Sequence, residues 1–398
     1  MRLSKRIERI QPSPTLAVTA QAKALIRQGV DVCSFAAGEP DFATPSHICE
    51  AAIEAINAGH TRYTAAPGMP AVREALSRFL TERFGLDYGA DEVILTVGGK
   101  HALYNIFQCL LDDGDEVIIP APFWVSYPAQ VELAGGTPVL VSATSEAGYK
   151  VTPESIEAAV TSRTRAIVLN SPCNPTGAAY NKEELTALAQ VAVKHDFIII
   201  SDEIYGELTY DGFEFHSIPA LGAEFRERTI IASGWSKTYS MTGWRLGWAA
   251  APRSFMSAMG KLQSQSTSNV PGMTQMAAMA ALEGSHDFLP EWIQAFDRRR
   301  RIMVSGLNGM EGVRCPSPQG AFYVFPDFSG VLGRQWKGSP IGTSLRLAEF
   351  LLEEARVAVV PGEAFGAPGC ARLSYATSDE VIEKGLSRIQ SALASLDG

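Results

Sequence analysis

Short apolar segments alternate with amphipathic helical segments between about residues 90 and 250, and this alternation restricts the possible folds more than any other feature of the chain. Strands that are apolar throughout and are separated by helices indicate a mainly parallel sheet with helices on both faces. We therefore predict an α/β fold with a seven-stranded, mainly parallel sheet. The predicted strands are VILTV (93–97), EVIIP (116–120), TPVLV (137–141), RAIVLN (165–170), FIIIS (197–201), TIIAS (229–233) and RLGWAAA (245–251).

The C-terminal part of the chain has a different pattern, in which helices are mixed with shorter apolar segments such as GAFYVF (320–325) and ARLSYAT (371–377). This mixture predicts a second, smaller α/β domain that the segment near residues 15–47 would join. The expected organisation is an N-terminal arm (1–14), a large domain (48–290) and a small domain (15–47 plus 291–398).

The composition excludes several classes of protein. The 398 residues carry a formal net charge of −9 without a long basic block, so nucleic acid and anionic membranes are not expected partners. No apolar run has the roughly 18–20 residues of a membrane helix, and the N-terminus lacks the apolar core of a secretory signal. The six cysteines have no metal-ligand spacing, which indicates reduced thiols in a cytoplasmic protein and no metal site. The run RRRR (298–301) lies in a helical stretch, and we interpret it as a solvated helix face.

Polar side chains follow several of the predicted strands. Because ligands bind at the carboxyl ends of the strands in open α/β sheets, the loops there should converge on one crevice. The four loops are GGK (98–100), NSPCNPTG (170–177), DEIY (202–205) and SGWSK (233–237).

Lys237 stands alone among serines, aromatic residues and glycines at the end of a buried strand. The residues around Gly99 do not have the spacing of a nucleotide P-loop, which is rejected, and no GxGxxG fingerprint of a dinucleotide fold follows a predicted strand. GWSKT matches the nucleophile elbow GxSxG only weakly, because its fifth position is Thr238. A partly desolvated lysine can instead form a Schiff base with a carbonyl, which pyridoxal 5′-phosphate (PLP) supplies. The loops offer the groups that PLP requires. Arg245, Ser236 and the helix start at Gly99 could take its phosphate, Asp202 its ring nitrogen, and Asn174 and Tyr205 its phenolic oxygen.

The chain resembles the fold-type I, PLP-dependent aminotransferases of class I and II. Within that family it is similar to the bacterial aspartate aminotransferases, in the branch that also includes prephenate aminotransferases. The matching motifs occur in order over nearly the whole chain. They are AAGEPDF (36–42), YTAAPGMPAVREAL (63–76), GGKHALYN (98–105), PFWVSYP (122–128), NSPCNPTGA (170–178), SDEIY (201–205), SKTYSMTGWR (236–245), GAFYVF (320–325) and RLSYATS (372–378).

This resemblance implies a role for each matching residue. The implied catalytic residues are Lys237, Asp202 and Tyr205. The implied cofactor-binding residues are Gly99, Lys100, Trp124, Asn174, Asp202, Tyr205, Ser236, Lys237, Arg245 and Tyr63. The implied substrate-binding residues are Gly38, Trp124, Asn174, Arg372 and Lys100. Because Tyr63 matches a tyrosine that reaches the phosphate of the neighbouring subunit, the resemblance also implies a homodimer with shared active sites.

The implied reaction moves the amino group of L-aspartate to 2-oxoglutarate through a PLP Schiff base, giving oxaloacetate and L-glutamate. Prephenate, aromatic amino acids and alanine are alternative substrates. Arg372 explains only the α-carboxylate, so Lys100 is the candidate for the distal carboxylate of a dicarboxylic substrate. Gln11 stands where many relatives carry a basic residue, which weakens the case for substrates with an extra carboxylate such as prephenate.

Simpler explanations exist for several of these residues. Asp202 could cap a following helix, Trp124 could belong to the core, and Arg372 could form an ion pair within the small domain. Tyr63 could pack within a loop, and Lys100 could support the phosphate-binding helix. A PLP-dependent lyase could use the same Lys237, Asp202 and Asn174, and the reaction products would distinguish it from an aminotransferase. A non-catalytic PLP-binding protein of the same fold would usually lose one of these residues, and none is lost here.

Overall fold

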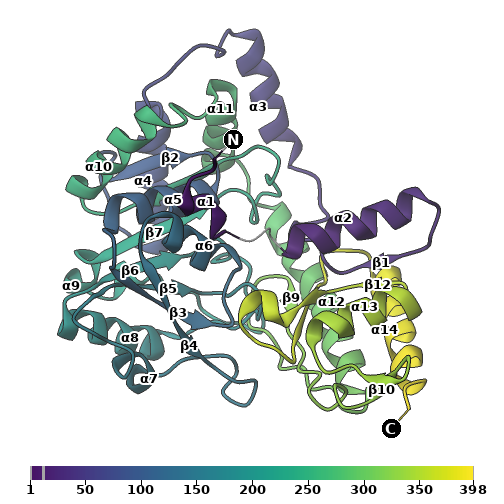
Figure 1. The fold of residues 1–398 in the computed structure, drawn as a ribbon. Helices are drawn as coiled ribbons and strands as arrows, with labels where there is room; N and C mark the ends of the chain where they lie inside the picture. Colours follow the sequence, from purple (N-terminus) through teal and green to yellow (C-terminus); the bar gives the residue numbers. More distant parts are fainter. Residues whose placement is uncertain (1, 11–13, 398) are drawn as a thin grey trace.

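The computed structural model describes residues 2–10 and 14–397 and shows two bodies side by side (Figure 1). The larger body contains a seven-stranded sheet in the order β2-β8-β7-β6-β5-β3-β4. β8 is antiparallel to both of its neighbours, and the other pairs are parallel. The predicted α/β fold with a mainly parallel sheet is therefore confirmed. The strands are β2 (Val93–Thr96), β3 (Glu116–Ala121), β4 (Thr137–Ser142), β5 (Thr164–Asn170), β6 (Ile198–Asp202), β7 (Thr229–Gly234) and β8 (Gly247–Ala250).

Helices cover the sheet on both faces, and their ends follow local sequence signals. At the start of α8 (Lys182–His195), Asn181 and Glu184 form a capping box in which each side chain accepts the other's backbone N–H at 2.8 Å. The other helices of this body are α3 (Ser46–Asn57), α4 (Pro70–Phe84), α5 (Gly99–Leu110), α6 (Ser126–Leu133), α7 (Pro153–Glu157), α9 (Ala223–Arg226), α10 (Arg253–Gln265) and α11 (Gly272–Glu283), with the 3-10 turn η1 (Ile218–Leu221).

β4 departs from the expectation of strands covered on both faces. It lies at the edge of the sheet, and its residues are exposed or half-buried, with Leu140 49% exposed. β2 at the opposite edge is buried at every residue, so the edge position alone does not account for the exposure of β4.

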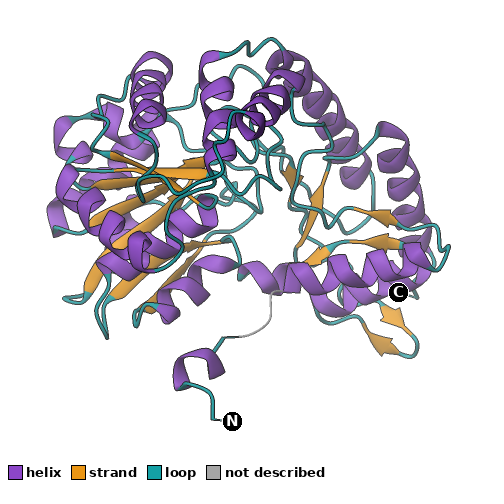
Figure 2. Ribbon diagram, turned by 90° about the horizontal axis from the view of Figure 1, so that it is seen from above, coloured by secondary structure: helices purple, strands orange, loops and turns teal. Residues whose placement is uncertain are grey.

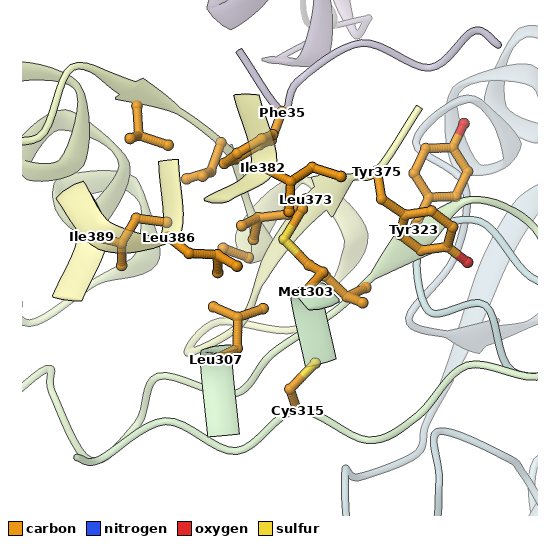
Figure 3. Packing of buried hydrophobic residues seen from close by; sticks show 14 of the residues in the cluster. Phe35, Met303, Leu307, Cys315, Tyr323, Leu373, Tyr375, Ile382, Leu386 and Ile389 are labelled. Atoms are coloured by element: carbon orange, nitrogen blue, oxygen red, sulfur yellow. The ribbon is translucent and has the colours of Figure 1, made fainter. Parts of the chain in front are cut away.

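The smaller body is built around a three-stranded antiparallel sheet, β13-β14-β9, and three helices. Figure 3 shows its core, in which Phe35, Met303, Leu373 and Ile382 point toward one another. The elements are α12 (Phe288–Asn308), α13 (Ser344–Glu354), α14 (Asp379–Ala394), β9 (Tyr323–Val324), β13 (Val360–Pro361), β14 (Ala371–Ser374), the pair β1 (Cys33–Ser34) and β12 (Val357–Ala358), the pair β10 (Gln335–Trp336) and β11 (Ser339–Pro340), and the 3-10 turn η2 (Gly362–Phe365).

Two N-terminal helices complete the fold, α1 (Lys5–Glu8) and α2 (Pro14–Arg27). Ala22 of α2 is buried against Leu352 and Ala358 of the smaller body. The domain limits at 14/15, 47/48 and 290/291 stay a prediction, and the last of them falls inside α12. None of the helices in the described residues is long and apolar enough to cross a membrane.

The expectation that the RRRR run (298–301) forms a solvated helix face is correct for two of the arginines and wrong for the other two. Arg298 and Arg301 are exposed, but Arg299 and Arg300 of α12 are 7% and 2% exposed. Successive helical residues are turned by about 100°, so a run of four cannot stay on one face. Arg299 donates to Asp41 at 2.9 Å and Arg300 to Asp211 at 2.6 Å, so both buried charges have partners.

A close backbone approach joins β8 to the start of α5. A Cβ added at Gly247 would lie 2.4 Å from the carbonyl carbon of Gly98 and 2.4 Å from the amide nitrogen of Gly99. Only a residue without a side chain allows this contact, which places the first turn of α5 directly against β8.

We predict that Gly247→Ala lowers the free energy of unfolding by roughly 1–3 kcal/mol, because the new methyl group must displace backbone atoms. Gly243→Ala is the control, since a Cβ there meets nothing within 4 Å. Urea unfolding of both variants measures the difference. Equal midpoints for the two variants would show that the approach at Gly247 is not a tight constraint.

Candidate active site

A cavity of about 510 Å³ lies between the carboxyl ends of the strands and the smaller body. Figure 2 shows the two bodies on either side of the connecting loops. Every predicted site residue except Tyr63 lines this cavity. These residues are Gly38, Gly99, Lys100, Trp124, Asn174, Asp202, Tyr205, Ser236, Lys237, Arg245 and Arg372.

Lys237 follows the end of β7 and is partly buried. Its amine donates a hydrogen bond to the carbonyl oxygen of Gly38. Burial and, to a lesser extent, the nearby positive charge of Arg372 lower the pKa of Lys237 to about 8. A substantial fraction of this amine is therefore neutral near pH 8, as a nucleophile or a base requires.

Asp202 ends β6 and is almost completely buried. Burial raises the pKa of Asp202 to about 6, although the hydrogen bond from Tyr127 lowers it. The Tyr127 hydroxyl donates to Oδ2 at 2.6 Å, and the amide of Ile204 donates to Oδ1 at 3.3 Å. A turn, and not a helix, follows Asp202, so the helix-cap explanation does not hold.

Arg372 lies on β14 and is 2% exposed. Its Nη1 donates to Asn174 Oδ1 at 3.0 Å and its Nη2 to the carbonyl oxygen of Ala36 at 2.9 Å. Its Nε is buried without a hydrogen-bond partner among the described residues, and it forms no ion pair with them. The alternative of an ion pair within the small domain is thus not supported. The guanidinium lies over the ring of Tyr323 at 4.6 Å.

Arg245 lies against the start of α5. Its Nη1 donates to the carbonyl oxygen of Thr242 at 2.8 Å, and a Cβ added at Gly98 would lie 2.6 Å from its Nη2. Gly98 has φ 90°, a conformation that glycine adopts without strain. The first N–H groups of a helix have no partners within it, so this end of α5 and Arg245 together form a site for an anion.

Lys100 and Trp124 also line the cavity, and Lys100 lies in the first turn of α5. The Lys100 amine lies 4.9 Å from the centre of the Trp124 ring, and burial lowers the pKa of this lysine. Trp124 also contacts Tyr127 edge to face, with ring centres 5.3 Å apart. Trp124 therefore both packs on the core and faces the cavity, so the two explanations for it are compatible.

The structure does not place two residues discussed in the sequence analysis, Tyr63 and Gln11, in this cavity. Tyr63 is 91% exposed and outside the cavity of its own chain, so it does not pack within a loop. Gln11 lies outside the described residues.

Other residues of the site were missed from the sequence. Tyr127 bonds Asp202, Tyr323 shares a 2.9 Å hydroxyl contact with Tyr205, and Asn170 accepts from the amide of Asn174 at 2.8 Å. Each stands inside a motif that supported the resemblance, which was a signal that could have identified it.

The comparisons with known proteins agree with this geometry. The profile of the family described as "Aminotransferase class I and II" matches residues 30–389. The chain is 48% identical over 98% of its length to the aspartate aminotransferase of Geobacillus stearothermophilus, covering 98% of that protein. It is 48% identical to the aspartate/prephenate aminotransferase of Cereibacter sphaeroides, covering 99% of each chain.

Solved structures give the same result. The aspartate aminotransferase of Rhizobium meliloti superposes with a TM-score of 0.96 at 42% identity over 100% of both chains. That of Thermus thermophilus, solved with maleate, gives a TM-score of 0.92 at 46% identity over 98% of this chain and 100% of the other.

The fold and the cavity are those of an aminotransferase. The chain belongs to the aminotransferase class I and II family, which confirms the resemblance inferred from its motifs.

The protonation of Asp202 makes the ligand-free protein sensitive to pH. The pKa of Asp202 is about 6 when folded and near 3.8 when unfolded, so the folded protein binds the extra proton between these values. Stability contributed by Asp202 therefore falls as the pH rises from about 4 to about 6.

We predict that Asp202→Asn stabilises the ligand-free protein at pH 8 by about 3 kcal/mol, because the amide avoids burying a charge. The gain should disappear as the pH falls from 6 to 4, where the carboxyl is neutral in both states. Urea midpoints at several pH values measure it, with exposed Asp113→Asn as the control. A difference between Asp202→Asn and the wild type that does not vary with pH would contradict the raised pKa.

Proposed function

We propose that this aminotransferase uses PLP to move the amino group of L-aspartate to 2-oxoglutarate, giving oxaloacetate and L-glutamate. The observation that carries the proposal is the meeting of Lys237, Asp202 and Arg372 in one cavity. The names of the relatives support the substrate, since those described above are aspartate or aspartate/prephenate aminotransferases.

The residues of the cavity fit PLP. Its phosphate would lie at the N-terminus of α5 beside Ser236 and Arg245, where the anion site described above is found. Asp202 is a buried carboxyl without an ion-pair partner among the described residues, so a ring N–H⁺ would satisfy it. Tyr205 and Asn174 would donate to the phenolic oxygen, and Trp124 would lie against the ring. When bound, PLP supplies an aldehyde that takes the amino group and a ring that withdraws electrons from the substrate Cα.

The substrate α-carboxylate would pair with Arg372. Each Nη makes one hydrogen bond within the chain, so their remaining hydrogens are available for a planar, bidentate contact. Gly38 would lie beside this contact, since a Cβ there would be 3.3 Å from Tyr323 Oη and 4.0 Å from Arg372 Nη2.

The Lys237 amine would take the proton from the substrate Cα and deliver it again later in the reaction. A pKa of about 8 suits both tasks, because the group changes its protonation near the working pH. Asp202, in its charged form, would keep a proton on the ring nitrogen.

We further propose a cytoplasmic homodimer in which Tyr63 reaches the phosphate site of the neighbouring subunit. Its 91% exposure in the single chain leaves it available for such a contact. A molecular mass in solution equal to that of one chain would contradict this assembly.

The decisive experiment follows visible absorption of the protein loaded with PLP. L-aspartate should abolish the band and 2-oxoglutarate should restore it. Lys237→Ala should still bind PLP but turn over at least about a thousandfold more slowly, since both nucleophile and base are lost. The exposed Lys182→Ala is the matched control. Near-normal turnover of Lys237→Ala, or a wild-type band unchanged by any amino acid, would refute the proposal.

Lys100 is the proposed contact for the distal carboxylate, and maleate, present in the Thermus structure, is likewise a dicarboxylate. We predict that Lys100→Gln raises KM for L-aspartate by about tenfold or more, the usual cost of a lost charged hydrogen bond. The KM for L-alanine, which lacks a distal carboxylate, should change little. An equal rise in KM for both substrates, together with weaker PLP binding, would instead show that Lys100 supports the phosphate-binding helix.

Prephenate is the second candidate acceptor, because the relative from Cereibacter sphaeroides is named for both substrates. Recovery of the absorption band on adding prephenate in place of 2-oxoglutarate would establish it.

A further inference from the structure

Residues 36–44 form an irregular segment that leads from the smaller body to the sheet, and we call it the crossing segment. Phe35, immediately before it, is completely buried in the core of the smaller body (Figure 3). α3 of the larger body begins directly after it. Because the segment lacks helix or strand hydrogen bonds, its position depends on contacts made by its side chains and carbonyl groups.

The start of the crossing segment holds two cations of the active site. The carbonyl oxygen of Ala36 accepts from Arg372 Nη2 at 2.9 Å, and that of Gly38 accepts from the Lys237 amine. A shift of this backbone would therefore move both hydrogen-bond acceptors away from their partners at once.

The far end of the segment is bonded to a loop of the larger body, where the Ser240 hydroxyl donates to the carbonyl oxygen of Phe42 and the Thr44 hydroxyl donates to that of Ser240 at 2.8 Å. Arg299 of α12 holds the same end from the smaller body. Its Nη1 donates to Asp41 Oδ1 at 2.9 Å, and its Nε donates to Asp379 Oδ1 at 3.2 Å at the start of α14. The guanidinium also lies over the ring of Phe42 at 5.5 Å. Phe42 itself stacks on Trp292 of α12, with ring centres 4.7 Å apart and the planes at 4°.

The type of side chain matters at this position. Arg299 is 7% exposed, so its charge must be paired, and its planar fork reaches two carboxylates on separate elements while stacking on an aromatic ring. Asp41 has Arg299 as its ion-pair partner among the described residues, whereas Asp379 is also held by Arg298 at 2.6 Å. Loss of Arg299 would therefore release Asp41 while leaving Asp379 paired.

We propose that Arg299 is a positioning residue for the aminotransferase reaction, because it fixes the crossing segment that orients Arg372 through the carbonyl oxygen of Ala36. It touches neither substrate nor cofactor and acts through Asp41 and Phe42. The inference rests on the role proposed above for Arg372.

The test compares Arg299→Gln with Arg298→Gln. Arg298 precedes Arg299 on the same helix and pairs with the same Asp379, but it does not contact the crossing segment. Both variants are saturated with PLP and assayed well below their melting temperatures, with any amino acid that the wild type transaminates. Global destabilisation would lower the melting temperature without changing the KM of folded, loaded enzyme.

We expect Arg299→Gln to raise KM for both the amino acid and the keto acid by about tenfold, because a displaced Arg372 binds the α-carboxylate less well. The change in kcat should be smaller than the change in KM. Arg298→Gln should keep the wild-type KM, and Arg299→Lys should recover part of the loss because it keeps one charge contact.

A second variant tests the proposal independently in case Arg299→Gln does not fold. Asp41→Asn conserves the shape of the side chain and should raise KM in the same direction. The KM of the double variant should not exceed that of Arg299→Gln alone, since both changes break the same Arg299–Asp41 ion pair. Wild-type KM in Asp41→Asn, or an equal rise in Arg298→Gln, would overturn the proposal. Failure of the proposed function would appear separately, as a wild type that does not transaminate.

Discussion

The desolvation of charge at one end of the sheet is the constraint on which the rest of the structure depends. Burial there lowers the pKa of Lys237 and raises the pKa of Asp202, so it favours the neutral form of both side chains. Such burial is costly unless other groups offset it, and the cavity supplies them through Tyr127 on Asp202 and a carbonyl oxygen on Lys237. The same cost is what makes the site chemically useful, because it prepares an amine that can change its protonation near neutral pH.

The larger body places these charges by close backbone packing. The parallel strands bring their carboxyl ends to one edge, and Gly247 allows the first turn of α5 to approach β8. This approach puts unpaired backbone N–H groups beside Arg245. A rigid sheet and a helix end therefore provide the anion site, while Lys237 and Asp202 extend from adjacent strands of the same sheet.

The smaller body contributes Arg372 to the cavity, so the contacts between the two bodies determine where this guanidinium lies. Arg372 comes from β14, yet one of its nitrogens is bonded to Asn174 of the larger body. Arg299 of α12 bonds Asp41 of the crossing segment and Asp379 at the start of α14, so one buried guanidinium holds these three elements together.

The sequence by itself determined the strand and helix pattern, the convergence of four loops and the identity of most cavity residues. The element pattern and the convergence of the loops follow from local periodicity and from the rule that parallel strands end at one edge. Cavity residues such as Lys100, Trp124 and Arg372 were instead identified through the resemblance of their motifs to a known family. Only the tertiary structure decided that β8 runs antiparallel, that Arg299 and Arg300 face inward, and that Tyr127 and Tyr323 belong to the site. Those features depend on contacts between residues far apart in the chain, such as Arg299 with Asp41 and Tyr127 with Asp202. Local patterns carry no information about such pairings, because the energy that selects them exists only once the chain has folded.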